Sequence, residues 1–155
     1  MKKIVSIAIN ALFAFMICLV ISCSGEDLDY KKACFNKDWP KAYEIVDKLQ
    51  DIAIEKNAKW REIQSDHGTE SLEQKPAKDD FQFAVYKYED AKRYVVLQES
   101  MSELEQGNLM RIAAIVKEQN APWVYKELIS IAKSIGEQDL VDKLTSMSEA
   151  NNTKP

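Results

Sequence analysis

The sequence predicts an all-α protein, either a small helical bundle or a short stack of antiparallel helical hairpins, behind an apolar amino-terminal segment. Glycine and proline, which break helices, are scarce, with four of each in 155 residues. Ala, Leu, Ile, Glu, Lys and Gln are common after the apolar segment. Apolar residues recur there at spacings of three and four, the period of one face of an α-helix. Both arrangements are open, because each joins antiparallel neighbours through short turns.

The first 22 residues have the three parts of a secretory signal peptide. Lys2 and Lys3 form a basic start, an apolar run of 18 residues extends from Ile4 to Ile21, and the small residue Ser22 follows. A membrane-spanning helix needs about 20 apolar residues. A retained amino-terminal anchor is therefore the competing interpretation.

Val20-Ile21-Ser22-Cys23 resembles the lipobox of bacterial lipoproteins, with an aliphatic residue at −3, a small residue at −1 and an obligatory cysteine. Val20 departs from the leucine that the family prefers. The resemblance implies that Cys23 is the lipid attachment site. Its sulfur would be joined to a diacylglycerol, the signal peptide would be cut before it, and the new amino terminus would be acylated, with palmitate as the expected acyl group. Such acyl chains tether a protein to a membrane without spanning it.

The residues after Cys23 favour a place in the bacterial cell envelope. Ser24 stands where an aspartate often retains such lipoproteins in the inner membrane, so the resemblance favours the outer membrane. The acidic run from Glu26 to Asp29 is similar to signals for display at the cell surface. A solvated helix start explains the same run, so a periplasmic and a surface-exposed position are both open.

Cleavage before Cys23 would leave 133 residues, which is one domain's worth. We expect one helical domain over 23–150 and a frayed tail over 151–155. The mature chain would carry 19 basic and 25 acidic side chains, a net charge of −6. This charge argues against nucleic acid as a partner, because sequence-independent binding requires clustered Lys and Arg. It also argues against electrostatic adhesion to anionic lipid.

Cys34 is the one cysteine that the mature chain would keep as a free thiol, since Cys18 leaves with the signal peptide and Cys23 is lipidated. No intramolecular disulfide is then possible. We expect Cys34 to be a small buried hydrophobic residue beside Phe35. Pairing between chains and a reactive thiol are the alternatives.

The first two helices are expected from Glu26 to about Phe35 and from Asp38 to about Ile63. Asp38 is a good amino-terminal cap, and Pro40 falls in the first turn, where a missing N–H costs nothing. The apolar stripe of the second helix comprises Ala42, Ile45, Val46, Leu49, Ile52, Ala53 and Trp60.

An exposed polar loop is expected over about 64–80, which lacks periodic apolar residues and contains Gly68 and Pro76. The third helix should run from about Asp80 to Gln106, with Gly107 as its carboxy-terminal cap. Its broad face holds Phe81, Ala84, Tyr88, Ala91, Val95 and Met101.

Three shorter helices complete the expected fold. Their apolar residues fall within 109–116, 123–135 and 140–147. Asn120 and Pro122 separate the first two, and Gly136 ends the second.

Two segments resemble each other. Residues Asn36 to Val46 match Gln106 to Val116, each with a turn, a cap, a basic residue and then Ile-Val, and a shorter echo begins at Gly136. Their separation of 70 residues is about twice the 34-residue period of tetratricopeptide repeats, which the helical hairpins weakly resemble. The intermediate repeat would fall in the polar loop, so an irregular bundle remains the alternative.

The sequence predicts no catalytic set, no cofactor and no metal. His67 is the one histidine and lies in the polar loop, without a Cys or second His to complete a zinc site. A solvated histidine is the expected role, and a carboxylate-rich metal site is the alternative. The four glycines are isolated, so no phosphate-binding loop is present.

Aromatic residues are the candidate binding residues. Trp60, Tyr86, Tyr88 and Tyr94 belong to residue types that anchor interfaces, although core residues with polar tips would give the same pattern. We therefore expect a lipid-anchored, non-enzymatic adaptor or protein-interaction module with an unidentified protein partner. The alternatives are a receptor for a small ligand or peptide that uses the aromatic helix face, and an immunity or inhibitor lipoprotein.

Mass spectrometry of the membrane-bound chain should find an amino terminus at Cys23 that carries acyl chains. Cys23→Ala should abolish lipidation, because the acceptor sulfur is lost, whereas Ser24→Ala should still be lipidated. A chain that still begins at Met1, or an unmodified Cys23, would contradict the lipoprotein prediction.

Overall fold

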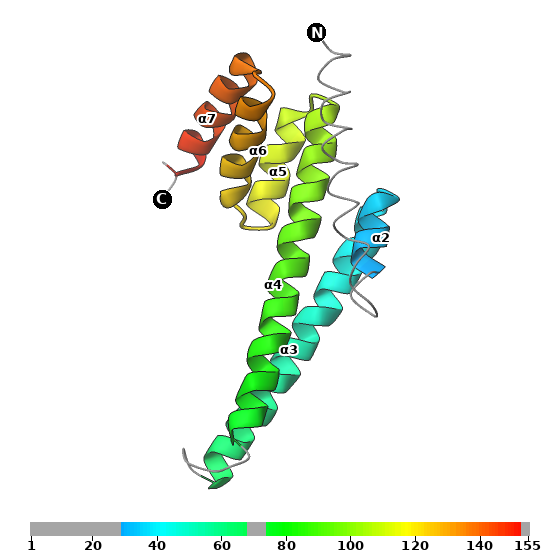
Figure 1. Ribbon diagram of the computed structural model, residues 1–155, viewed down its shortest axis with the longest axis vertical. Coiled ribbons are helices and arrows are strands. Elements are labelled where there is room, and N and C mark those ends of the chain that lie inside the picture. Colours follow the sequence, from blue (N-terminus) through cyan, green and yellow to red (C-terminus); the bar gives the residue numbers. More distant parts are fainter. Residues whose placement is uncertain (1–28, 68–73, 153–155) are drawn as a thin grey trace. The chain divides into compact units, whose positions relative to one another are not determined.

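The structure is a computed structural model that describes residues 29–67 and 74–152, and no strand occurs among them (Figure 1). In chain order the helices are α2 (Asp29–Phe35), α3 (Trp39–His67), α4 (Gln74–Glu105), α5 (Leu109–Glu118), α6 (Trp123–Ser134) and α7 (Gln138–Asn152). The predicted all-α class is confirmed. Among these helices, none has the length and apolar character that crossing a bilayer requires. The predicted signal peptide and Cys23 lie outside the described residues.

The described chain divides into two compact units. The hairpin unit contains α2, α3 and α4 as far as Val95. The carboxy-terminal unit begins at Val96, within α4, and continues through α5, α6 and α7. The one helical domain expected over 23–150 stays a prediction, and the described residues of both units fall almost entirely within its bounds. Buried apolar residues occur in both units, so each has material for a core of its own.

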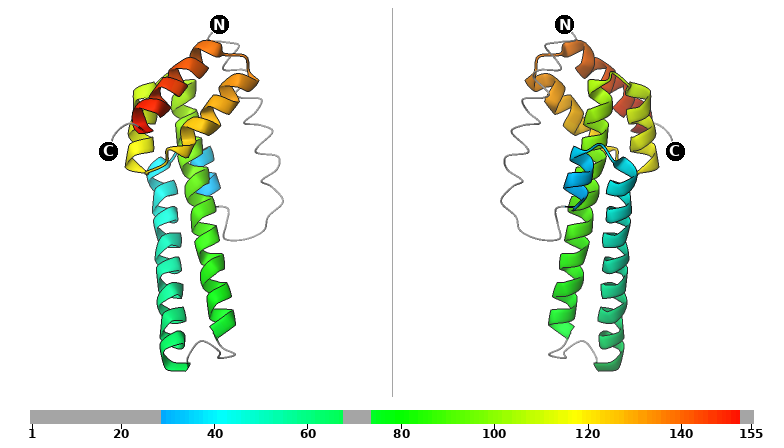
Figure 2. Two further views of the ribbon diagram at one scale, coloured as in Figure 1. Left: turned by 90° about the vertical axis from the view of Figure 1, so that its left-hand side faces the viewer. Right: turned by 90° about the vertical axis from the view of Figure 1, so that its right-hand side faces the viewer.

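In the hairpin unit, α3 and α4 lie side by side and run antiparallel, and α2 packs near the start of α3 (Figures 1 and 2). The buried core consists of Tyr30, Ala33, Cys34, Ala42, Val46, Ala91 and Val95. Cys34 is 3% exposed there, so the expected buried cysteine is confirmed. Isolated helices as short as α2 are unstable in water, and α2 therefore depends on this packing.

In the carboxy-terminal unit, successive helices bury one apolar face each. The fully buried large side chains include Val96, Ile112, Ile115, Val116, Val124, Leu128 and Leu144. A charged pair accompanies them: Arg111 Nη2 lies 3.1 Å from Oε1 of Glu99, whose side chain is 5% exposed. Arg111 Nη1 also lies 3.4 Å from Glu118. The buried carboxylate is thus compensated, which a buried charge requires.

Four turns between helices share one geometry. Lys37, Gly107, Asn120 and Gly136 have positive φ angles of 57°, 74°, 49° and 76°. At each turn, the amide of the positive-φ residue donates to the carbonyl three residues earlier, and the next amide donates to the carbonyl five residues before it. The four pairs of donors are Lys37 and Asp38, Gly107 and Asn108, Asn120 and Ala121, and Gly136 and Glu137. This is the Schellman motif, which satisfies carbonyl groups at a helix end.

The similarity between Asn36–Val46 and Gln106–Val116 has a local cause in these turns. Each segment follows the same turn with a capping side chain. Asp38 Oδ1 accepts from the Lys41 amide at 3.2 Å, and Asn108 Oδ1 accepts from the Arg111 amide at 3.3 Å. A shared turn and cap therefore account for the match without a solenoid repeat.

The exposed loop expected over about 64–80 is wrong at both ends. α3 continues to His67, and α4 begins at Gln74. Residues 68–73 lie outside the described residues. Among the residues of these helical ends, Gln64, Gln74, Lys75, Ala77 and Lys78 are good helix formers that do not need burial. Pro76 falls in the first turn of α4, where its missing N–H is harmless.

The other helix boundaries agree more closely with those expected from the sequence. Trp39 and Trp123 open α3 and α6, as expected from the proline beside each. α7 extends to Asn152, so the first two residues of the frayed tail expected over 151–155 are helical. Residues 153–155 lie outside the described residues.

Gly136→Ala should lower the free energy of unfolding by about 1 kcal/mol, because an L-residue is strained at positive φ. Nothing lies within 4 Å of the added Cβ, so a steric clash would not contribute. Asn120→Gly, at the equivalent position of another turn, should raise stability slightly. Urea unfolding followed by circular dichroism measures both, and an unchanged Gly136→Ala variant would contradict the assigned turn.

Candidate binding site on the helical hairpin

The four candidate aromatic residues all lie in the hairpin unit, but they do not converge on one groove. Tyr88 is partly buried against the core. Tyr94 packs edge-on against Tyr30, with ring centroids 5.7 Å apart, and burial raises the pKa of its hydroxyl. Tyr86 is 68% exposed. Two of the three tyrosines are therefore packing residues.

Trp60 also packs within the hairpin. Its ring stacks on Phe81 with centroids 5.6 Å apart and an interplanar angle of 14°. Its indole nitrogen is buried and has no hydrogen-bond partner among residues 29–67 and 74–152. A buried donor without a partner costs free energy, so the ring stack must offset that cost.

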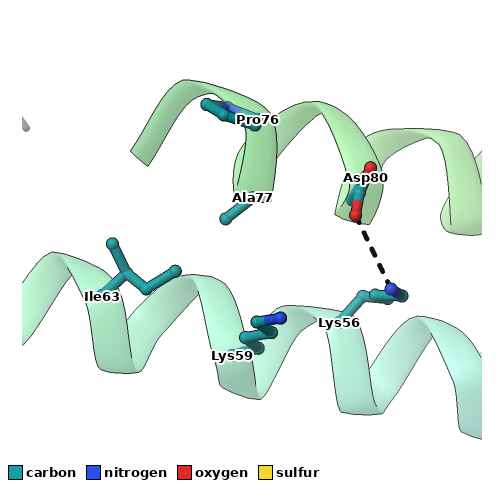
Figure 3. Close-up of a pocket in the computed structure, with 6 residues that line it drawn as sticks. All are labelled: Lys56, Lys59, Ile63, Pro76, Ala77 and Asp80. Atoms are coloured by element: carbon teal, nitrogen blue, oxygen red, sulfur yellow. Dashed lines mark ion pairs between the residues drawn. The ribbon is translucent and has the colours of Figure 1, made fainter. Parts of the chain in front are cut away.

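A small hollow between α3 and α4 was not expected from the sequence. It has a volume of about 170 Å³. It is lined by Lys56, Lys59 and Ile63 from α3 and by Pro76, Ala77 and Asp80 from α4 (Figure 3). Sequence reasoning missed it, because it treated the residues that begin α4 as loop.

The residues that line this hollow belong to two longer rows, each of which follows one side of a helix. The set on α3, called here the α3 stripe, comprises Lys41, Ile45, Lys48, Ile52, Lys56, Lys59 and Ile63. The set on α4, called the α4 stripe, comprises Pro76, Asp80, Phe83, Lys87, Asp90 and Tyr94. Residues three or four apart are neighbours on a helix surface, so each stripe is continuous.

The two stripes lie on the same side of the hairpin. Lys56 Nζ of the α3 stripe lies 3.6 Å from Asp80 Oδ2 of the α4 stripe. Lys59, Ile63 and Pro76, from the two stripes, line the same hollow (Figure 3). Both groups in the ion pair are well exposed, so the pair contributes little stability. It does show that Lys56 and Asp80 stand beside each other across the two stripes.

The short helix α2 covers one end of this side. The Tyr30 hydroxyl donates to Asp90 Oδ2 at 3.4 Å, and the Tyr30 ring packs on Tyr94. The stripe residues beyond α2 are called here the open face, which comprises Ile52, Lys56, Lys59, Ile63, Pro76, Asp80, Phe83 and Lys87. Phe83 is 60% and Ile52 45% exposed, and Lys87 Nζ lies 4.9 Å from the Phe83 ring centroid.

The lysines of the α3 stripe differ in their partners. Lys41 and Lys48 lie 2.9 and 2.6 Å from the carboxylate of Glu44. The hydrogen bonds from Lys48 and then Lys41 lower the pKa of Glu44 to about 2. The Lys59 ammonium, by contrast, has no salt-bridge partner in the part of the chain that the structure describes. Of the four lysines of the α3 stripe, only Lys59 has no ion-pair partner among the described residues.

Within the described residues, no cluster of three or more His, Cys, Asp and Glu side chains could hold a metal ion. The side chain of His67 lies outside those residues. Comparisons of the chain with family models, curated proteins and solved structures found no match. The geometry of the hairpin is therefore the basis for the proposals below.

Trp60→Ala should lower the free energy of unfolding by about 3 kcal/mol, because it removes a stacked ring. Trp60→Phe should change it by less than about 1 kcal/mol, since the ring stays and the unpaired N–H is lost. Denaturant unfolding followed by circular dichroism gives both values. Full stability of Trp60→Ala would show that Trp60 is a surface residue and not a packing residue.

Proposed function

We propose that the protein is a lipid-anchored lipoprotein of a bacterial envelope, favouring the outer membrane, and that it is a non-enzymatic protein-interaction module. In this proposal, Cys23 carries the anchor and the α3–α4 hairpin meets the partner. The lipobox-like residues support the first part, and the exposed side chains of the hairpin support the second.

The observation that carries the partner role is the exposure of large apolar side chains on one helical hairpin. Ile52, Ile54, Phe83 and Tyr86 are each 45% or more exposed. Exposed apolar groups that occur together mark interaction sites, and aromatic side chains among them provide most of the binding energy. A helical module that contacts another protein explains these residues without further assumptions.

A small-ligand receptor is less well supported. Ligand pockets usually have volumes of about 300–1,000 Å³, whereas the hollow on the hairpin has about 170 Å³. Tyr88, Tyr94 and Trp60, which would line such a site, pack against other residues of the hairpin unit. Contact with a protein surface therefore fits the hairpin better than enclosure of a ligand.

The proposed anchor would bring the hairpin unit to the membrane surface. Six residues follow Cys23 up to and including Asp29, the first residue of α2. At 3.3–3.6 Å per extended residue, they reach at most about 20 Å. A partner in the same membrane would then meet the protein at high effective concentration. A contact of modest affinity would suffice.

A photo-reactive benzoylphenylalanine at Phe83 should form an adduct with a protein of the envelope when the chain is expressed in its own cells. The same group at Lys78, an exposed residue of α4 outside the α4 stripe, should not. Immunoblots after irradiation report the adduct. If position 83 gives no adduct in membrane-bound chain, the proposed role of the hairpin is wrong.

A further inference from the structure

We propose that the corner between α2 and α3 lies in the interface of the lipid bilayer that holds the Cys23 anchor. The corner comprises the outward side of α2, the turn at 36–38 and the first turn of α3. This inference rests on the proposed function and adds the surface through which the hairpin unit meets the lipid. It follows from the distance of the corner from the anchor, from its exposed aromatic side chains and from its balanced charges.

The chain between the anchor and α2 is short enough to keep the corner at the membrane. The residues that follow Cys23, up to Asp29, reach at most about 20 Å when extended. α2 has seven residues, which at 1.5 Å per residue rise about 10 Å, and the turn to α3 follows directly. Because the reach of the tether exceeds the length of α2, the start of α2 can stand back from the lipid while its far end touches it.

Two aromatic residues flank the turn at the corner. Phe35 ends α2 with its side chain 64% exposed, and Trp39 begins α3 and is only partly buried against the core of the hairpin unit. Aromatic rings are enriched at membrane interfaces, where binding strength scales with the apolar area that is buried. A single exposed ring is common on protein surfaces. Here the anchor keeps the ring within reach of lipid, so a weak contact is sufficient.

The side of α2 that carries Phe35 is turned away from the hairpin. Tyr30, Ala33 and Cys34 are buried. Asp29, Lys32 and Phe35, spaced three residues apart, are exposed, and residues at that spacing share one side of a helix. The corner lies at the end of the hairpin unit opposite the connection between α3 and α4 (Figure 2). The Phe35 ring is therefore available to a surface beyond that end.

The charges at the corner nearly cancel, so the contact is with the neutral interface of a bilayer and does not require anionic lipid. The exposed charged residues there are Asp29, Lys32, Lys37, Asp38, Lys41 and Glu44. Lys41 already pairs with Glu44 at 2.9 Å. The ammonium of the half-buried Lys31 lies 5.7 Å from the ring centroids of Tyr30 and Tyr94, and Asp90 of α4 adds a carboxylate beside Tyr30.

Contact at the corner determines which end of the hairpin unit faces the membrane. Ile54 lies 15 residues beyond Trp39 on α3, a rise of about 22 Å. With the corner in the interface, this part of α3 stands away from the lipid. The exposed residues that the proposed function assigns to a protein partner then remain accessible.

The first test uses the lipidated chain in nanodiscs of neutral phosphatidylcholine, with photo-reactive benzoylphenylalanine at position 35. Mass spectrometry after irradiation should find the chain joined to one phospholipid. The same group at Ile54, which is 59% exposed and therefore comparable to Phe35, is the matched control. It should give at least about tenfold less lipid adduct, because only a group at the interface meets acyl chains.

The second test uses Trp39 as the reporter, in a lipidated chain with Trp60→Phe and Trp123→Phe. Brominated lipids quench tryptophan only at short range, and they should lower the emission of Trp39 by about half or more. Phe35→Ser should remove most of this quenching, because the exposed ring is lost. Asn36→Ser, at the neighbouring exposed residue, should leave it unchanged. Unchanged circular dichroism spectra verify that both substitutions leave the fold intact.

Four results would overturn this inference. They are no lipid adduct at position 35, equal lipid adducts at positions 35 and 54, adducts between two copies of the chain in place of lipid, and quenching of Trp39 that Phe35→Ser leaves unchanged. If Cys23 nevertheless carries lipid and the photo-adduct at Phe83 forms in cells, the proposed function stands and only the bilayer contact is wrong. If Cys23 carries no lipid, the anchor and this inference are both wrong.

Discussion

Two helices packed together can bury only the side that each presents to the other, and this limit governs the hairpin unit. The rings of Trp60 and Phe81 stack between α3 and α4. The small buried side chains of Ala84 and Ala91 allow the two helices to approach each other. Ile52 and Phe83 lie at the margin of this contact and remain exposed. A third helix is required to cover them. α2 meets that requirement at one end, where it completes the core around Ala42 and Val46, and its seven residues are too few to cover the rest.

The lysines of the α3 stripe have different partners at the two ends of the hairpin. Near α2, the Glu44 carboxylate forms ion pairs with both Lys41 and Lys48. Towards the connection, Lys59 has no such partner in the described part of the chain.

Local rules predicted the helices better than the site. Asp38, Asn108 and Gly107 were interpretable as caps and turns, because those residue types have strong backbone preferences. The loop over 64–80 was mispredicted, since an exposed helix of polar residues has no apolar period. Aromatic residue type suggested Tyr88 and Tyr94, whose burial depends on α2 and could not be read from α4 alone. The alternation of lysine and isoleucine along α3 was visible in the sequence. The role of these α3 residues depends on which α4 residues lie beside them, and the sequence alone does not give that register.

Hydrogen–deuterium exchange of the lipidated chain in neutral nanodiscs tests most directly the claim that the bilayer covers one end of the hairpin unit and leaves the rest open to a partner. The comparison is an unlipidated Cys23→Ser chain in solution, made without residues 1–22. We predict slower amide exchange over residues 35–39 in nanodiscs, because contact with lipid suppresses local opening of the corner. Exchange over residues 52–63 of α3 should stay unchanged. Unchanged exchange at the corner, or slower exchange confined to residues 52–63, would contradict the claim.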